Sequence, residues 1–353
     1  MRVTCGLHPH RKMAEAPDFA RKREAMGFDG LWVPEAQHNP FTALALVAEH
    51  SEHVRIGSNV TVAFARSPYV MANHGWDLQE YSGGRFIIGM GTQVKGHNER
   101  RFSVPWGPPN PRLREYMEMM RACWHTWRTG EKPNYEGQYY RYTLDAWNWN
   151  PGPIDYPDPP IVLAAVRPLN TRLAAEVGDG VLWHRMMSWA YRDQVLVPAL
   201  EEGARRAGKD PKDLVIAGGG FVVTAKTEEK LIAELAELKR WMSFYASTRS
   251  YHDAMKMAGL EDEAMLLHRL SIEQKWDEMV KIIDDDFLEK FAIVGTWDEI
   301  AGKMREVYGG LNTEIQLRME IEDPDDEEHI KEIMAEVRTI PSYGEIERTP
   351  AAA

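Results

Sequence analysis

Short apolar runs alternate with longer amphipathic stretches along most of the chain. The short runs are continuously apolar, as in parallel strands that are buried on both faces. Eight such strands are predicted, at residues 2–7, 30–34, 54–62, 85–91, 161–166, 180–184, 214–224 and 313–320. Helical spacing is found between them, at residues 17–26, 40–51, 68–81, 111–128, 170–177 and 190–207. Proline near the start and glycine just past the end, as at Pro17 and Gly27, are expected helix boundaries.

Strands that are each followed by a helical stretch predict an α/β fold. Eight such strand–helix units predict a (β/α)8 TIM barrel. A doubly wound sheet is the competing architecture. It normally has a glycine-rich turn after its first strand, whereas residues 6–10 read Gly-Leu-His-Pro-His. Residues 225–312 lie between strands seven and eight and are mostly helical. We therefore expect one domain over residues 1–353 with a long helical insertion at 225–312.

The amino-acid composition limits the kinds of partner and the cellular compartment that we expect for this protein. The chain has 353 residues, and its 42 Lys plus Arg against 54 Asp plus Glu give a formal net charge of −12. Nucleic-acid binding needs a clustered basic surface, so such a partner is not expected. Two cysteines, Cys5 and Cys123, make no disulfide framework and indicate a reducing compartment. No secretory signal is visible at the N-terminus, and no apolar run approaches the about 20 residues that span a bilayer. We expect a soluble cytoplasmic protein without a membrane partner.

In a barrel of this kind, chemistry takes place at the C-terminal ends of the strands. The polar residues that the sequence places there are His8, His10, Glu35, Gln37, His38, Ser58, Asn59, Thr61, Thr92, Gln93, Lys95, His97, Arg167, Asn170, His184, Arg185, Thr224 and Glu320. They predict an enzyme-like, partly basic rim, but by themselves they name no reaction.

One alternative is a metal-dependent barrel hydrolase. His8-Pro9-His10 could supply the first two ligands of a metal site, with His184 as a single later match. Strand five offers no histidine and strand eight ends in Met319-Glu320, so the ligand set is incomplete. We expect no metal, with one of the two histidines lining a pocket and the other at the surface.

Two further features have competing interpretations. Gly218-Gly219-Gly220 lacks the Lys-Ser/Thr that follows in a phosphate loop, so a bulge or a close backbone contact is the better interpretation. The loop at residues 92–114 carries Lys95, Arg100, Arg101, Arg112 and Arg114. It favours either an anionic ligand or a solvated face whose cations pair with local carboxylates.

The motifs GFDGLWVPE at residues 27–35 and SGGRFIIGMG at 82–91 resemble the bacterial-luciferase-like superfamily of flavin- and deazaflavin-dependent oxidoreductases. IVLAAV at 161–166 and GDGV at 178–181 fall in family order, and the similarity covers most of residues 1–225 and resumes around 291–320. QVKGHNERRF at 93–102 is similar to the branch that uses coenzyme F420 rather than FMN. The resemblance thus implies an F420-dependent oxidoreductase.

The resemblance also implies cofactor contacts. It places a cis peptide bond between Ser58 and Asn59, at the end of strand three, as support for the central ring. The matching positions around the ring and the tail of the cofactor are Glu35, Thr61, Thr92, Gln93, His97, Val166, Arg167, Leu169 and Asn170. The turn at 166–170 opens a helix, a geometry that suits a phosphate, and Arg167 would add a charged hydrogen bond.

The chain departs from relatives that oxidise sugar phosphates. Ala36 replaces a histidine that acts as a general acid in those relatives, and Val94 replaces a glutamate that acts as a base. Their chemistry is therefore not expected here. His38, His8 and His184 are alternative proton donors, since histidine titrates near neutral pH.

We therefore expect hydride transfer between F420 and a small organic substrate. The alternatives are an FMN monooxygenase that uses oxygen and reduced flavin from a reductase, the metal-dependent hydrolase, and a non-catalytic deazaflavin carrier. Trp106 and part of residues 241–251 are expected to line the pocket, which favours an apolar or aromatic substrate. The resemblance also implies a homodimer through the helices at 41–49 and 69–81. The sequence leaves open the substrate, the direction of transfer and which histidine acts.

Overall fold

The structure is a computed structural model that describes residues 1–8, 12–319, 321, 323 and 325–346. The chain divides into two compact units. The N-terminal unit is Cys5–Ala164 with Leu173–Val181, and the C-terminal unit is Met1–Thr4 with Ala165–Arg172 and the chain from Leu182 onward. Within the described residues, no helix has the length and apolar character needed to cross a membrane.

In the N-terminal unit, buried parallel strands pair side by side. They are β2 (Gly30–Val33), β3 (Arg55–Ser58), β4 (Thr61–Val62), β5 (Phe86–Gly91) and β8 (Ile161–Ala165). β3 pairs with β2 and β5, and β5 also pairs with β4 and β8. The apolar runs form strands because nearly every side chain is covered, as the fully buried pattern of β5 illustrates.

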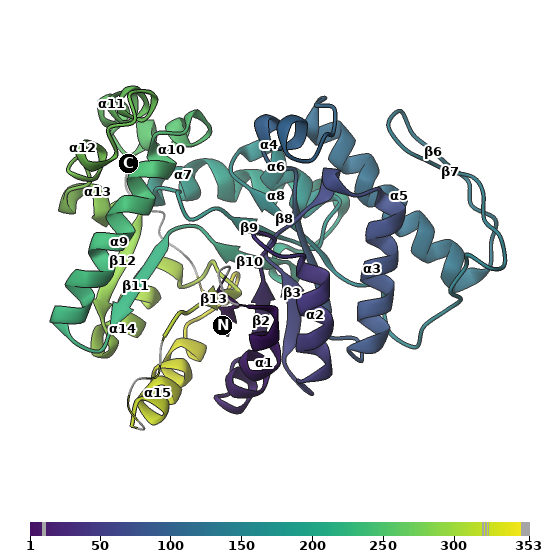
Figure 1. The fold of residues 1–353 in the computed structure, drawn as a ribbon, viewed down its shortest axis with the longest axis horizontal. Helices are drawn as coiled ribbons and strands as arrows, with labels where there is room; N and C mark the ends of the chain where they lie inside the picture. Colours follow the sequence, from purple (N-terminus) through teal and green to yellow (C-terminus); the bar gives the residue numbers. More distant parts are fainter. Residues whose placement is uncertain (9–11, 320, 322, 324, 347–353) are drawn as a thin grey trace. The chain divides into compact units, whose positions relative to one another are not determined.

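Helices surround this ladder (Figure 1). They are α1 (Ala16–Ala25), α2 (Pro40–Glu49), α3 (Pro68–Tyr81), α4 (Lys95–Arg100) and α5 (Pro109–Thr129), with the hairpin β6 (Tyr135–Glu136) and β7 (Arg141–Tyr142) after them. Proline occupies the first turn of α2 and α3, and the side chains of Asn39 and Ser67 accept hydrogen bonds from the first-turn N–H groups of Phe41 and Val70.

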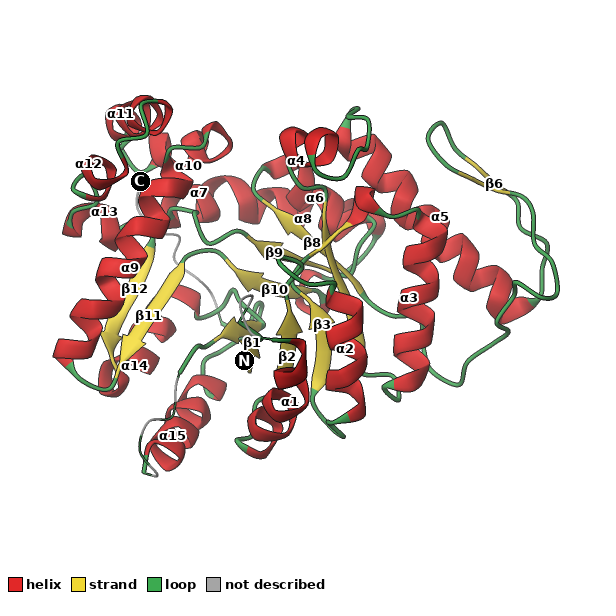
Figure 2. Ribbon diagram, viewed as in Figure 1, coloured by secondary structure: helices red, strands yellow, loops and turns green. Residues whose placement is uncertain are grey.

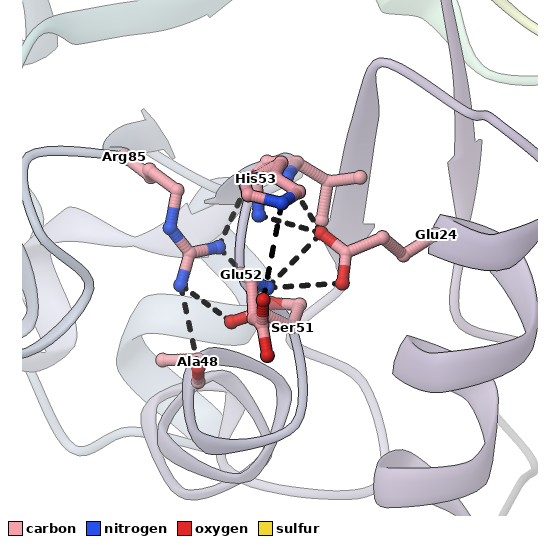
Figure 3. A network of polar contacts seen from close by, with 7 residues as sticks. Glu24, Ala48, Ser51, Glu52, His53 and Arg85 are labelled. Atoms are coloured by element: carbon pink, nitrogen blue, oxygen red, sulfur yellow. Dashed lines mark hydrogen bonds and ion pairs between the residues drawn. The ribbon is translucent and has the colours of Figure 1, made fainter.

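A network of polar contacts fixes the connection from α2 to β3 (Figure 3). The Glu24 carboxylate accepts hydrogen bonds from the backbone N–H groups of Glu52, His53 and Val54 at 2.6–3.0 Å. Arg85 donates to the carbonyls of Ala48, Ser51 and Val54. Burial alone would raise the pKa of Glu24, but the three N–H groups and the charge of Arg85 lower it. The network precedes the strands and therefore positions β3 and β5 rather than taking part in chemistry.

The remaining strands lie wholly or in part in the C-terminal unit. β1 (Arg2–Gly6) and β10 (Val215–Gly218) both pair in parallel with β13 (Glu314–Gln316), and β9 (Gly180–Trp183) follows β10 in the sheet. A separate parallel pair, β11 (Phe221–Ala225) with β12 (Ala292–Thr296), packs against α9 (Glu228–Ala246) and α14 (Trp297–Tyr308) (Figure 2). The other helices are α6 (Pro168–Glu176), α7 (Trp189–Tyr191), α8 (Val197–Ala207), α10 (His252–Met257), α11 (Glu261–Ile272), α12 (Trp276–Val280), α13 (Asp285–Glu289) and α15 (Asp326–Arg338).

The strand order is β3-β2-β1-β13-β10-β9-β8-β5-β4, and β3 also pairs with β5. The ladder therefore closes on itself, which is the topology of a (β/α)8 TIM barrel. The predicted fold class is confirmed. The expectation of a single domain with an insertion at residues 225–312 stays a prediction.

Three predicted strands are wrong in detail. The strand expected at 54–62 is two strands, β3 and β4, because the chain bends at Asn59 and Val60. The strand expected at 214–224 is two strands, β10 and β11, because Gly218, Gly219 and Gly220 have φ angles of 81°, 75° and 116° and turn the chain. A Cβ on Gly218 would lie 2.1 Å from the carbonyl oxygen of Trp183, so the predicted close backbone contact is confirmed. The strand at 313–320 is limited to Glu314–Gln316, while Glu320 lies outside the described residues.

The segment at 225–312 is not helical throughout. β12 lies inside it and pairs with β11 over five residues in parallel register. Sequence reasoning missed this strand because a five-residue apolar run between helices has no periodicity of its own.

Candidate active site

A bidentate ion pair holds the end of β2 against β4. Arg66 donates to Glu35 through both Nη atoms, at 2.8 and 2.9 Å, and the two side chains are only 14% and 13% exposed. The Val62 N–H and the Thr61 hydroxyl donate to the same carboxylate at 2.7 and 2.8 Å. Burial alone would raise the pKa of Glu35, but these donors outweigh it and lower it. Glu35 is therefore an ionised clamp, and Thr61 is bound to it.

The cis peptide bond predicted at Ser58–Asn59 lies one residue later, between Asn59 and Val60. The reason is that regular strand pairing still includes Asn59, whose N–H donates to the Val33 carbonyl at 2.9 Å. The Val60 carbonyl then accepts from the Glu35 N–H at 3.4 Å. The bend at the end of strand three was thus predicted correctly in kind and wrongly in position.

Ser58 lies below this bend and is fully buried. Its hydroxyl donates to the Gly89 carbonyl at 2.7 Å and accepts from the Gly89 N–H at 3.1 Å. Both hydrogen bonds tie β3 to β5. The side chain of Asn59, by comparison, is half-buried.

The loop after β5 presents Thr92, Gln93 and His97. Gln93 is exposed, with φ at +58°, and its side chain accepts from the Val94 N–H. Asn98 is fully buried and donates to the carbonyls of Thr92 and Val94 at 2.9 and 3.1 Å, which fixes the loop. Nδ1 of the half-buried His97 is a covered atom for which the described residues provide no hydrogen-bond partner. That atom has capacity for a ligand.

The turn after β8 belongs to the C-terminal unit. Val166 and Asn170 are half-buried, Arg167 is exposed and Leu169 is 59% exposed, all at the start of α6. Arg167 Nε lies 3.5 Å from Asp253 Oδ2, so the guanidinium already has an acidic neighbour. An exposed leucine at a helix start is a surface that an apolar ligand would cover.

His184 follows β9 and lies within an aromatic cluster of the C-terminal unit. Its ring stacks on Tyr251, with centroids 4.6 Å apart, and meets Tyr245 edge-on at 4.8 Å. The Met186 N–H donates to Nδ1 at 3.1 Å, and Nε2 lies 3.2 Å from the Tyr251 hydroxyl. Burial, with the charge of Arg185, lowers the pKa of His184 to about 4. At neutral pH the imidazole is therefore neutral and donates Nε2–H to Tyr251.

The other predicted histidines lie elsewhere. His38 is exposed in a bend before α2, and His8 is half-buried after β1. His10 lies outside the described residues. Among the residues that the structure describes, no three His, Cys, Asp or Glu side chains gather in a way that could hold a metal ion.

The basic loop is largely occupied by its own neighbours. Arg114 pairs with Glu176 at 2.8 Å, and Lys95 lies 3.9 Å from Glu99. Arg112 lies over the Phe64 ring at 4.3 Å and donates to the Tyr140 hydroxyl. Three of the five cations of this loop therefore have local partners.

Sequence reasoning missed Arg66, Asn98 and the individual role of Tyr251. Arg66 and Asn98 have ordinary local sequence surroundings, and only their tertiary partners distinguish them. Tyr251 lay within the segment at 241–251 that was expected near the substrate, but its partner His184 is 67 residues away in sequence.

Comparisons with known proteins add the following. The family model of luciferase-like monooxygenases matches residues 1–313. An uncharacterized protein of Mycobacterium tuberculosis is 42% identical over 300 residues, which cover 85% of this chain and 88% of the relative. A putative coenzyme F420-dependent oxidoreductase of the same species is 29% identical over 322 residues, with the same two coverages.

Two solved structures share the fold. The F420-dependent tetrahydromethanopterin reductase of Methanopyrus kandleri matches with a TM-score of 0.76 at 22% identity, covering 96% of this chain and 98% of that one. The oxygenating constituent of 3,6-diketocamphane monooxygenase of Pseudomonas putida, in complex with FMN, matches with a TM-score of 0.66 at 16% identity, covering 97% and 99%.

Proposed function

Since this chain belongs to the luciferase-like monooxygenase family, whose members are oxidoreductases and monooxygenases, we propose that it is an F420-dependent oxidoreductase that acts on a small organic substrate. The observation that carries the proposal is the 29% identity, over 85% of the chain, to a relative named for F420 dependence. The fold shared with an F420-dependent reductase is consistent with it.

The residues present fit a large planar cofactor with a polar edge and an anionic tail. His97 has a covered Nδ1 to which the described residues bring no hydrogen-bond partner. Leu169, a predicted contact, and Val94, next to Gln93, are exposed apolar side chains. We propose that Asn59, Thr92, Gln93 and His97 border the ring system. Val166, Arg167, Leu169 and Asn170 would hold the tail at the start of α6.

Glu35 and Thr61 have a positioning role in this proposal. The carboxylate already accepts from Arg66, Val62 and Thr61, so it has little capacity left for a ligand. Ser58 likewise acts on the backbone of β5. Together they hold the bend at Asn59–Val60 in one place, and a rigid support keeps the reacting atoms aligned.

The bound deazaflavin would supply the carbon that gives or takes the hydride. The chain's own part would be to orient the substrate and to handle a proton. His184, neutral at pH 7, donates Nε2–H to Tyr251, which leaves the tyrosine's own proton free to point at a substrate oxygen. Among the three predicted histidines we therefore favour His184, acting through Tyr251, over the exposed His38.

The second candidate is an FMN-dependent monooxygenase, which the structural likeness to an FMN complex favours. Reduced flavin reacts readily with oxygen, whereas reduced deazaflavin resists it. The two candidates therefore differ in cofactor affinity and in oxygen consumption.

The test is a side-by-side fluorescence titration of the purified protein with F420 and with FMN. We expect micromolar or tighter binding of F420, much weaker binding of FMN and no oxygen uptake with the reduced deazaflavin. A preference for FMN accompanied by oxygen uptake would establish the monooxygenase instead. Binding of neither cofactor would refute the proposal.

A further inference from the structure

The C-terminal ends of β9 and β13 bring together cationic side chains within the C-terminal unit. Arg185 follows β9 by two residues, and Arg318 follows β13 by two residues. Arg185 Nη2 donates to Oε1 of Gln316, the last residue of β13, at 3.1 Å. Both arginines are exposed, whereas Gln316 is half-buried.

The described residues bring no carboxylate to Arg185. The groups that act on its charge are Tyr245, Tyr308 and Arg318. Burial raises the pKa of Tyr245 and raises that of Tyr308 to about 12, so both phenols are neutral. The adjacent His184 is neutral as well. Arg66, by comparison, pairs with the Glu35 carboxylate at 2.8 Å.

A guanidinium in this environment is incompletely compensated. The protein packed around the guanidinium lowers the pKa of Arg185, and the like charge of Arg318 lowers it further. The described residues give this exposed guanidinium no counter-ion, so an anion bound there would have no carboxylate to displace. The planar fork of arginine matches a carboxylate or a phosphate in a bidentate manner.

We propose that Arg185, oriented by Gln316, binds an anionic group of the substrate, and that the substrate is a small aromatic carboxylate. This inference rests on the proposed function. Gln316 fixes one Nη atom and leaves the remaining N–H groups of the guanidinium for the ligand.

The apolar part of such a substrate has a matching surface next to Arg185. The Tyr245 ring lies 4.8 Å from His184, 6.0 Å from Tyr251, 5.7 Å from Phe244 and 6.1 Å from Trp241 between centroids. Trp241 and Phe244 are each 49% exposed. A flat ring bound against this cluster would extend the aromatic packing while its carboxylate meets the guanidinium.

The test uses benzoate as the probe and benzamide as its neutral counterpart of nearly the same shape. Isothermal titration of the full chain is expected to show benzoate binding that is about tenfold to hundredfold tighter than benzamide binding, the range of a charge-assisted hydrogen bond. Arg185→Gln is expected to abolish this difference, and Arg185→Lys to restore part of it.

A second variant tests the site without removing the arginine. Gln316→Glu puts a carboxylate 3.1 Å from the guanidinium with almost no change of shape. The new carboxylate would neutralise Arg185 and is expected to abolish benzoate preference in a folded protein. The matched control is Arg269→Gln, which removes the same charge from an exposed position on α11. It should leave benzoate binding unchanged.

F420 titrations of the same variants distinguish the two sources of an anion. Equal F420 affinity in wild type and Arg185→Gln places the anion on the substrate. If Arg185→Gln weakens F420 but not a deazaflavin stripped of its anionic tail, then Arg185 binds the cofactor and the inference is overturned. Absence of benzoate preference in wild type, or its persistence in both variants, also overturns it. If wild type binds benzoate selectively but neither F420 nor FMN, the anion site stands and the proposed function fails.

Discussion

Replacing Glu35 by glutamine tests whether the clamp at the end of β2 stabilises the candidate site. The carboxylate accepts four short hydrogen bonds, two from Arg66 and one each from Val62 and Thr61. A glutamine of the same size keeps one acceptor oxygen but turns an N–H₂ group toward donors, and the Arg66 charge loses its partner.

The cost follows from burial. Both side chains are about one-seventh exposed, so water replaces the lost interaction only partly. Breaking a buried pair by removing one partner costs about 3–5 kcal/mol, whereas an exposed pair contributes less than about 1 kcal/mol. We expect Glu35→Gln and Arg66→Met to lower the free energy of unfolding by about 3 kcal/mol each.

The assay is urea unfolding followed by tryptophan fluorescence, combined with F420 titration of each folded variant. In the double variant neither charge is left unpaired, so its loss should be at least about 2 kcal/mol smaller than the sum of the single losses. Asp18→Asn is the control, because it breaks an exposed pair with Arg21 and should change little. Strict additivity, or single losses as small as that of the control, would refute the clamp.

Three further predictions follow from other parts of the molecule. The pKa of His184 in the folded protein, about 4, lies below the ordinary value of histidine. The contribution of His184 to stability is therefore complete above about pH 6.5 and is lost as the pH falls toward 4. The free energies of unfolding of wild type and His184→Gln should converge at acid pH. The pKa of Glu24 is also lowered, so the stability difference between wild type and Glu24→Gln should shrink below about pH 4.5, and a constant difference would contradict the network of Figure 3. Gly218→Ala should prevent folding or lower stability far more than Gly208→Ala. The new methyl group would lie 2.1 Å from a carbonyl oxygen at position 218 and in open space at position 208. Similar melting temperatures of the two variants would contradict this prediction.

Much of the fold was predictable because its signals are local. Continuous apolar runs marked the barrel strands, and the proline at residue 40 and the glycine at 130 marked helix boundaries that the structure confirms. Prediction failed where long-range pairing decides. The run at 214–224 has uniform strand character, but the close approach of the Trp183 backbone to Gly218 divides it in two.

For the candidate site, the sequence supplied the positions but not their partners. Glu35, Thr61 and His184 were selected because they end strands, which is a property of the pattern alone. The sequence does not reveal that Glu35 is occupied by Arg66, or that His184 hydrogen-bonds Met186 and Tyr251 and is kept neutral by burial and the charge of Arg185.

The sequence by itself determined the fold class and family, because hydrophobic periodicity and short motifs are written in neighbouring residues. Only the tertiary structure decided which charges are paired. Pairing depends on residues brought within about 3 Å across gaps of 31 positions for Arg66 and Glu35 and 131 for Arg185 and Gln316. An arginine looks the same in sequence whether it clamps a carboxylate, as Arg66 does, or has no carboxylate among the described residues beside it, as Arg185 does. That difference, on which our proposal for Arg185 depends, arises from packing alone.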